Sequence, residues 1–206
     1  EIIANDSNIN EIMGIEPMNY KEAVALAFQK IEQNAVVSSW KDAMTSGVIN
    51  DRLSDHIQIP RFGCYKDIRS RKIQNEKSTI SKIWSIGGKN GWYGFNFLWE
   101  IRGFIDQIFG GVGLRRGRKN ESDVKAGEAL DFWRVLYADK KQKRMLLYAE
   151  MRLPGEAWLE FKILEDKLFL RAVFRPKGVL GRMYWYSILP FHNFVFKGML
   201  NELTKE

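Results

Sequence analysis

Three successive segments in the second half of the chain show a side-chain pattern that repeats every two residues. They cover residues 145–152, 157–163 and 168–174, and short turn-forming sequences separate them. Successive side chains of a β-strand point to opposite faces of a sheet, so this period predicts strands with one largely apolar face. Three such strands in direct succession predict an antiparallel meander, and any fold assigned to the chain must contain one.

The first hairpin of this meander turns at a Pro-Gly pair. Residues directly opposite each other must share a face, so the loop needs an odd number of residues. A loop of residues 153–155, with its glycine at positive φ, meets this condition. It predicts that Met151 lies opposite Ala157 and that Glu150 lies opposite Trp158.

The second hairpin can be aligned on its apolar residues, with Ile163 opposite Leu168. This register pairs two acidic residues of one strand with two arginines of the next, namely Glu160 with Arg171 and Glu156 with Arg175. Opposite charges at facing positions stabilise a sheet. The two charge pairs therefore support a register that was chosen on apolar residues alone.

The segment 129–137 is also predicted to be a strand, but neither of its faces is wholly apolar. One alternation turns Arg134 inward and the other turns Asp131 inward, so an interior charge is expected at one of these positions. A buried charge must be paired or bind something polar. A salt bridge to a neighbouring strand is the preferred explanation.

The first half of the chain shows helical signals around one strand. Asn19 followed by Glu22 is typical of a capped helix start and predicts a helix that runs to about residue 34. A strand is expected at 65–74. A short helix is expected at 78–86, with Ser78 as its cap.

Two further helices are expected. Apolar residues at helical spacing predict one at 98–108, which Gly110 should end. The segment 181–204 predicts a long C-terminal helix that Pro190 should kink or split. Its apolar residues cover more than one face, so it should lie between the sheet and a second surface, which is left open between the preceding helices, a partner chain and a membrane.

The expected order is therefore a strand, two helices, an antiparallel meander and a long C-terminal helix. This is the order of an α+β helix-grip fold, in which a sheet wraps the last helix and often leaves an apolar cavity. We predict such a domain at residues 56–206, after a short helical appendage and connector at 1–55. The first residues form neither a signal peptide nor an initiator methionine, so the chain is expected to be a piece of a longer protein.

Composition sets a few limits on function. With 206 residues, of which 45% are hydrophobic and 13% aromatic, the chain can bury a large core. Cys64 is the only cysteine, so no internal disulfide can form and a cytoplasmic location is expected. No apolar run is long enough for a membrane span. The net charge of +7 is scattered and the aromatic residues are expected in the core, so nucleic-acid binding is not favoured.

Few residues support catalysis or metal binding. His56 and His192 are scattered, and no metal-ligand spacing is present. Glu150 and Glu160 are expected on the outer face of the sheet, so catalysis by paired carboxylates with Asp131 is not favoured. We therefore assign no catalytic residue and no metal ligand.

Three arginines, Arg115, Arg116 and Arg118, follow the glycine-rich sequence 110–113 and could bind a phosphate or carboxylate. The alternative is a strand edge whose arginines are solvated or structurally paired. The glycines do not form a dinucleotide-binding fingerprint, because their spacing is wrong and they follow a helix instead of a strand. No cofactor is expected to bind to this chain.

Several motifs between residues 60 and 203 resemble a bacterial family of unknown function. They include Gly87-Gly88-x-x-Gly91-Trp92-Tyr93, Leu98-Trp99-x-x-Arg102-Gly103, Asp131-Phe132-Trp133-Arg134-Val135 and Phe174-x-Pro176-x-Gly178. In this order they are similar to the domain-of-unknown-function family 2867. The resemblance implies a place in the START and Bet v 1-like superfamily of helix-grip domains.

The same resemblance implies a larger parent protein. Such domains are found at the C-terminus of atypical short-chain dehydrogenase/reductase proteins, which are NAD-dependent epimerase/dehydratase-like and carry an NAD(P)-binding Rossmann half. Residues 1–46 resemble the tail of that half, with Pro17–Ala23 and Ser38–Ala43 as the matching segments. The implied parent is an NAD(P)-dependent oxidoreductase or epimerase, whereas no activity is expected of this chain alone.

Two functions remain open. In the first, which the superfamily resemblance favours, a small apolar ligand binds in a cavity lined by Trp92, Phe97, Trp133, Met151, Phe161, Phe174, Tyr184 and Tyr186. In the second, aromatic side chains fill the cavity, and the domain docks the Rossmann half or forms a homodimer. A cavity of roughly several hundred cubic ångströms would favour the first function, and a solid core with an exposed apolar patch would favour the second.

Overall fold

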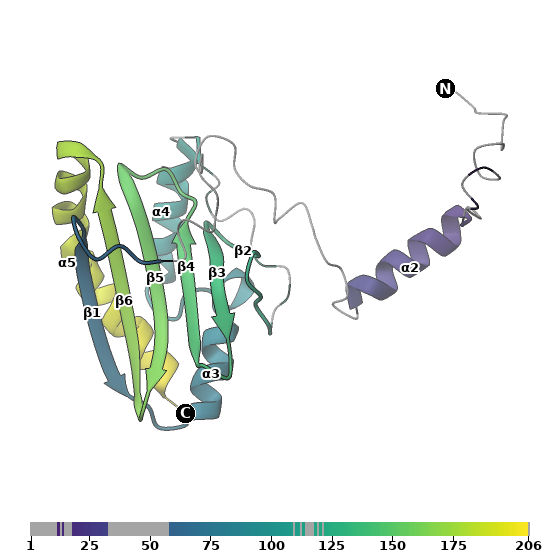
Figure 1. Cartoon of the computed structure of the whole chain (residues 1–206), viewed down its shortest axis with the longest axis horizontal. Helices are drawn as coiled ribbons and strands as arrows, with labels where there is room; N and C mark the ends of the chain where they lie inside the picture. The colour runs from purple at the N-terminus through teal and green to yellow at the C-terminus, as the bar shows by residue number, and fades with distance from the viewer. Residues whose placement is uncertain are drawn as a thin grey trace. The chain divides into compact units, whose positions relative to one another are not determined.

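Figure 1 shows the protein as a computed structural model. The structure describes residues 12, 14, 18–32, 58–108, 110, 111, 113, 118, 120 and 122–205. The chain divides into two compact units, Glu1–Ser38 and Ser39–Glu206. The predicted domain boundary between residues 55 and 56 lies outside the described residues.

The first unit contains helix α2, Tyr20–Glu32. The Oδ1 atom of Asn19 accepts a hydrogen bond of 2.9 Å from the backbone N–H of Glu22. This contact satisfies one of the free N–H groups at the helix start. The predicted cap is therefore confirmed, and the predicted end at about residue 34 lies outside the described residues.

The second unit is built on one antiparallel six-stranded sheet with the order β1-β6-β5-β4-β3-β2. The strands are β1 Tyr65–Lys72, β2 Ala129–Leu130, β3 Trp133–Asp139, β4 Arg144–Ala149, β5 Gly155–Leu164 and β6 Lys167–Pro176. The helices are α3 Glu76–Trp84, α4 Asn96–Ile108 and α5 Gly178–Thr204, with a short 3-10 turn at Gly88–Asn90. The predicted order of strand, two helices, meander and long helix is confirmed.

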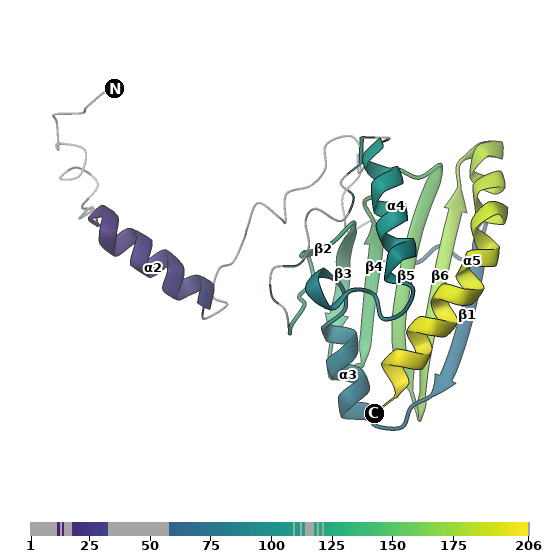
Figure 2. The same ribbon diagram turned by 180° about the vertical axis from the view of Figure 1, so that it is seen from behind.

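The helices α3, α4 and α5 all lie on one face of the sheet (Figures 1 and 2). Helix α5 packs on the edge strand β1 and on its neighbour β6, and α3 touches α5. The edge strand fixes α5 partly through polar contacts, because the guanidinium of Arg69 donates to Oδ1 of Asn193 at 2.8 Å. Among the described residues, no helix combines the length and apolar character that crossing a membrane requires.

The predicted register of the β5–β6 hairpin is confirmed. Ile163 pairs with Leu168, and both charge pairs form, Glu160 with Arg171 and Glu156 with Arg175. Glu160 is almost buried on the outer face of the sheet, where Arg144 on β4 also contacts it at 2.7 Å. The apolar alignment therefore gave the correct register and the correct charge partners.

The predicted register of the β4–β5 hairpin is wrong by two residues. Tyr148, and not Glu150, pairs with Trp158, and residues 150–154 connect the two strands. Glu150 leaves the ladder because its carboxylate binds the guanidinium of Arg134 through two hydrogen bonds of 2.8 and 3.0 Å. The backbone N–H of Arg152 donates to Asp106 at 2.7 Å. These two long-range contacts replace the tight loop that the Pro-Gly pair suggested.

The predicted strand at 129–137 is interrupted. Asp131 has a φ of 53°, and the chain turns there between β2 and β3. Both charged residues of this segment are buried. Arg134 forms the predicted salt bridge, with Glu150, and Asp131 lies in the turn instead of in a strand.

Two helix predictions also need correction. Helix α3 begins at Glu76, and its N-cap is Asn75, whose side chain accepts from the N–H of Ser78 at 3.1 Å. Ser78 is therefore in the first turn. Helix α5 runs through Pro190 as one continuous helix, so the predicted split does not occur.

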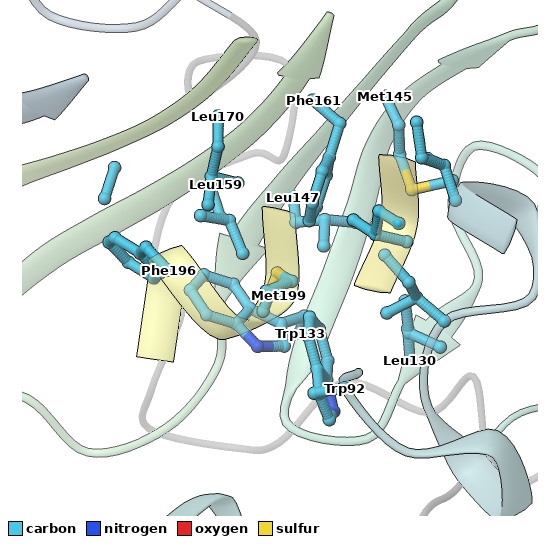
Figure 3. Close-up of a cluster of buried hydrophobic side chains, with 14 of the residues drawn as sticks. Trp92, Leu130, Trp133, Met145, Leu147, Leu159, Phe161, Leu170, Phe196 and Met199 are labelled. Carbon is cyan, nitrogen blue, oxygen red and sulfur yellow. The ribbon is translucent and has the colours of Figure 1, made fainter. Parts of the chain in front are cut away.

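The two faces of the sheet carry separate apolar clusters. The larger cluster lies under the helices and includes Leu147, Leu159, Phe161, Leu170 and Met199 (Figure 3). A smaller cluster lies on the opposite face and consists of Leu136, Leu146, Tyr148, Trp158 and Val173. The meander is thus buried on both faces, which explains why its alternation is apolar on one face and mixed on the other.

Candidate functional site

A pocket of about 300 Å³ lies between the sheet and helices α4 and α5. Its size falls at the lower end of the range for small-molecule sites, and its wall is mostly apolar. The lining residues are Leu98, Trp99, Ile101, Arg102, Ile105, Trp133, Met151, Leu153, Ala157, Trp158, Leu159, Ala172, Val173, Phe174, Tyr184, Trp185, Ile188, Phe191, His192, Val195 and Phe196.

Four of the eight residues predicted to line a cavity are in this wall: Trp133, Met151, Phe174 and Tyr184. They come from β3, the β4–β5 connection, β6 and α5, so the pocket joins distant parts of the chain. Phe174 also contacts the ring of Trp185, with centroids 5.9 Å apart and nearly parallel planes. The sheet and α5 therefore meet at the pocket through an aromatic contact.

The other four predicted residues lie elsewhere. Trp92 and Phe161 are buried in the core under the helices, where Trp92 stacks on Phe132 at 6.2 Å. Phe97 on α4 and Tyr186 on α5 are exposed. Neither lines the pocket; the ring of Phe97 packs on Phe95, and that of Tyr186 packs on Tyr65 of β1, with centroids 5.6 Å apart.

The sequence analysis missed the contribution of α4. Leu98, Ile101, Arg102 and Ile105 lie three or four positions apart on this helix and line the pocket together. Their helical spacing predicted the helix, but it did not show what this face of the helix would contact. Only the position of α4 above the sheet shows that this face borders a pocket.

Asp106 holds α4 at the end of the pocket. This buried carboxylate accepts from the N–H of Arg152 at 2.7 Å and from the N–H of Gly113 at 2.9 Å. A Cβ added to Gly111 would lie 2.2 Å from the same carboxylate, so the chain needs a glycine there. Asp106 thus fastens the last turn of α4 to the β4–β5 connection.

His192 lines the pocket on the α5 side and faces the carboxylate of Asp67 on β1. The Nδ1 atom of His192 lies 3.6 Å from Oδ2 of Asp67, which suits an ion pair when the imidazole is protonated. Partial burial raises the pKa of Asp67, but His192 and Arg69 lower it by more, to about 2. Asp67 therefore stays ionised beside His192 at the edge of the pocket.

Two residues that line the pocket have a buried indole N–H with no hydrogen-bond partner among the described residues. They are Trp99 and Trp133. The nearby Trp92 differs, since its indole N–H donates to Oδ2 of Asp131 at 2.9 Å. Buried donors are nearly always paired in folded proteins, so the two free donors are unusual.

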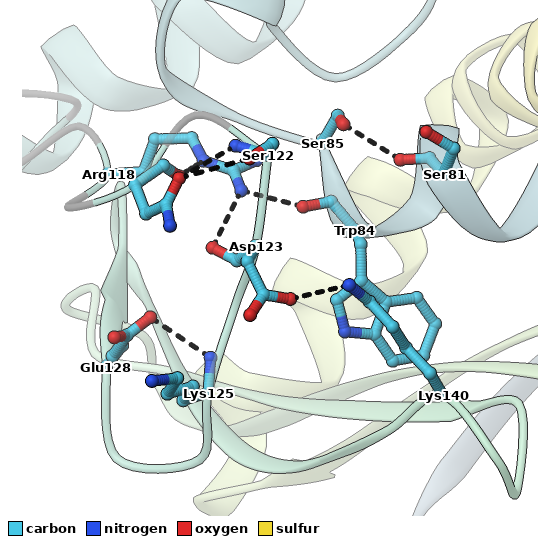
Figure 4. Close-up of polar contacts among 10 residues, drawn as sticks. Ser81, Trp84, Ser85, Arg118, Ser122, Asp123, Lys125, Glu128 and Lys140 are labelled. Atoms are coloured by element: carbon cyan, nitrogen blue, oxygen red, sulfur yellow. Dashed lines mark hydrogen bonds and ion pairs between the residues drawn. The ribbon is translucent and has the colours of Figure 1, made fainter. Parts of the chain in front are cut away.

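Arg118 is the one residue of the predicted arginine cluster that the structure describes, because Arg115 and Arg116 lie outside the described residues. Its guanidinium donates to backbone carbonyls, including those of Trp84 at 2.7 Å and Asp123 at 3.2 Å (Figure 4). Burial lowers its pKa, while the charge of Asp131 acts in the opposite direction. Arg118 fastens the loop that precedes β2 to the end of α3.

The two interior charges have structural partners. Asp131 accepts from the indole of Trp92 and from the N–H of Gly88 at 3.2 Å. Arg134 binds Glu150 and also donates to the carbonyl of Gly127 at 2.9 Å. Within the described parts of the chain, no group of three or more His, Cys, Asp or Glu residues is placed to hold a metal ion.

Helices α4 and α5 carry many exposed apolar side chains, a set that we call the apolar rim. Its residues are Phe97, Ile101, Phe104, Ile105 and Ile108 on α4, and Val179, Leu180, Met183, Tyr186, Leu189, Phe191 and Phe194 on α5. Large groups of exposed apolar side chains usually mark a binding surface. The sequence prediction that α5 has apolar residues on more than one face is therefore confirmed.

The fold and the pocket define a class of protein: an α+β domain in which a long C-terminal helix lies on an antiparallel sheet beside a ligand-sized cavity. The sequence model of the DUF2867 family, described as "Protein of unknown function", matches residues 63–199. The chain belongs to this family. No curated protein matches it significantly.

Proposed function

We propose that this DUF2867 domain binds a small apolar molecule in the pocket between α4, α5 and the sheet. The observation that carries the proposal is the cavity of about 300 Å³, whose wall is built mainly from aliphatic and aromatic side chains. Apolar cavities of this kind with a few polar groups are typical of small-molecule sites. The proposal also accounts for the four predicted lining residues that meet there.

A pocket-filling substitution tests this function. Ala157 lies on the pocket face of β5, opposite Phe174, so Ala157→Phe should occupy the cavity. Native mass spectrometry of the purified chain should detect a bound small molecule that Ala157→Phe lacks. The matched control is Ala126→Phe, at an exposed loop position, which should keep it. A chain that binds neither a co-purifying molecule nor any added apolar probe would contradict the proposal.

The architecture supports a helix-grip assignment within this proposal. Strand β1 pairs with the last strand, β6, and α5 follows directly and lies on the same sheet. This arrangement agrees with the order that the START and Bet v 1-like resemblance implies. We propose on the same basis that the chain is an accessory domain of a reductase-like parent in the cytoplasm, which carries the NAD(P) site.

The accessory role can be tested by nucleotide binding. NADPH fluorescence should change when the nucleotide is titrated with a protein that includes the Rossmann half. The present chain should leave it unchanged, because it lacks the dinucleotide fingerprint. Tight binding of NADPH by the present chain would contradict this assignment.

A second function is favoured by the apolar rim, namely an interaction domain that pairs with another copy or with the Rossmann half. Phe104→Lys combined with Leu180→Lys would place two charges on the rim without changing the lining of the pocket. If the rim forms a homodimer, light scattering should show a dimer for the natural chain and a monomer for the double variant. If the natural chain is monomeric at high concentration, the homodimer hypothesis is contradicted.

A further inference from the structure

Arg102 on α4 places a positive charge at the wall of the pocket. It is the only Lys or Arg among the lining residues, and these residues include no Asp or Glu. Arg102 is half-buried, and its guanidinium carbon lies 6.0 Å from the centre of the Tyr184 ring on α5. Tyr184 itself lines the pocket. The guanidinium therefore lies between the two helices, against a residue of the pocket wall.

The other arginines of the domain that are not exposed provide a comparison. Five described arginines are buried or half-buried, and four of them bind oxygen atoms of the protein: Arg69, Arg118, Arg134 and Arg144. Arg102 is the fifth, and it has no carboxylate or carbonyl partner within the described part of the chain. A charge that is partly removed from water without such a partner is costly, so a ligand that supplies an anionic oxygen gains affinity.

The acidic residues near Arg102 on the same helix do not pair with it. Asp106 follows one turn later, but its two oxygens accept hydrogen bonds from the backbone N–H groups of Gly113 and Arg152. Glu100 precedes Arg102 by two positions, and residues two apart do not face each other on a helix. The described wall of the pocket is thus positively charged at Arg102 and carries no carboxylate to balance it.

We propose that the ligand is an apolar molecule with one carboxylate, and that Arg102 binds this carboxylate. This inference rests on the proposed function and specifies the chemistry of the bound molecule. The planar guanidinium matches the two oxygens of a carboxylate, and hydrogen bonds between charged groups are stronger than neutral ones. A phosphate monoester carries nearly two charges at neutral pH, which a single arginine does not balance. The apolar residues of the wall surround the rest of the ligand.

The cavity volume guides the choice of probes. A volume of about 300 Å³ has room for roughly ten groups of the size of a water molecule. Octanoate has about this number of heavy atoms, and octanol and octylamine have almost the same shape. At neutral pH the acid is negatively charged, the alcohol is neutral and the amine is positively charged. The three probes therefore differ mainly in the charge of one end.

Calorimetric titration of the natural chain with these probes tests the inference. Octanoate should bind about tenfold more tightly than octanol, because one charged hydrogen-bonded contact is added, and octylamine should bind more weakly than octanol. Arg102→Gln removes the charge and should lower the ratio of octanoate to octanol affinities to about one. The affinity for octanol should stay the same, since the apolar wall is unchanged.

The matched control is Arg182→Gln, which removes the same charge from an exposed position on α5 that does not line the pocket. It should leave the ratio of octanoate to octanol affinities unchanged, so it separates a direct contact from the general attraction of a basic protein for anions. Heteronuclear NMR of the natural chain avoids any dependence on the folding of a variant. The guanidinium N–H signal of Arg102 should shift with octanoate more than with octanol.

The outcomes separate this inference from the proposed function. Equal affinities for octanoate and octanol, or a preference for octylamine, would overturn the carboxylate assignment while the pocket function stands. An octanoate preference that survives in Arg102→Gln would overturn the role of Arg102. Failure of every probe to bind would instead contradict the pocket function itself.

Discussion

The two halves of helix α5 differ in how they meet the rest of the domain. The C-terminal half is closely packed, and Val195, Phe196, Met199, Leu200 and Leu203 are all buried in the core. The N-terminal half borders the pocket with some of its side chains and exposes most of the others. The C-terminal half of this apolar helix is therefore packed in the core, which we call the closed half. The N-terminal half is largely exposed, and we call it the open half.

Side-chain size explains part of this difference. In the closed half, Gly198 faces Gly94, and a Cβ added to Gly94 would lie 3.0 Å from the carbonyl carbon of Gly198. Two residues without side chains let the backbones approach this closely. In the open half, Tyr184, Trp185 and Ile188 line the space between α5 and its neighbours. Large aromatic residues on α5 thus border the pocket, whereas close backbone contact at Gly198 brings the other half against the residues around Gly94.

The largest expected effect comes from two methionines on this helix. Met199 is fully buried in the closed half, so Met199→Ala should lower the free energy of unfolding by about 2–5 kcal/mol. Met183 is 63% exposed in the open half, and Met183→Ala should change the free energy of unfolding by less than about 0.5 kcal/mol. Urea denaturation of the two variants measures both. Equal effects would show that the two halves are covered to the same extent in solution.

Pro190 lies between the two halves and should give an intermediate effect. It has no N–H, so the carbonyl of Tyr186 lacks its usual helical partner. Pro190→Ala should raise the free energy of unfolding by about 1–3 kcal/mol. The control Ser187→Ala, one turn earlier, should change it by only a few tenths, about the difference in helix propensity. If Pro190→Ala destabilises the chain in thermal unfolding, the helix needs the proline to hold its two halves in place.

The smallest expected effect concerns pH, at Asp67, which forms a salt bridge with Arg69 and faces His192 beside the pocket. The pKa of Asp67 in the folded chain, about 2, lies below the ordinary value of 3.8 for an aspartate. The carboxylate therefore stabilises the fold above pH 3.8, and this contribution is lost as the pH falls toward 2. Asp67→Asn should remove it, at most about 2 kcal/mol after allowance for solvent screening. Between neutral pH and pH 2, the free energy of unfolding should fall less steeply for the variant than for the natural chain. Identical slopes would contradict the assignment.

Local patterns in the sequence predicted much of this fold. The period of two gave the strands of the meander, and apolar matching gave the β5–β6 register with both of its charge pairs. The order of strand, helices, meander and long helix followed from capping residues and helical spacing. Each of these signals depends on residues that are neighbours in the sequence or across one tight turn.

The errors arose where distant residues compete with local signals. Glu150 binds Arg134, and the carboxylate of Asp106 accepts a hydrogen bond from the N–H of Arg152. Because of these contacts, the Pro-Gly pair does not form the tight loop that its sequence favours. The pocket was predictable only in part for the same reason. The aromatic residues of the strands identified one wall, whereas the contribution of Trp99, Arg102 and His192 depends on how two helices are placed above the sheet.

The pairing of β1 with β6 has a consequence for how the chain folds during synthesis. Tyr65 lies opposite Phe174, so about a hundred residues must be made before this strand finds its partner. At typical rates of translation, β1 waits for roughly 5–20 s, and pairings of such long range form slowly. Helix α5 emerges later still. We therefore expect the pocket to be the last part of the domain to form, and a nascent chain that stops before β6 to be a substrate for chaperones.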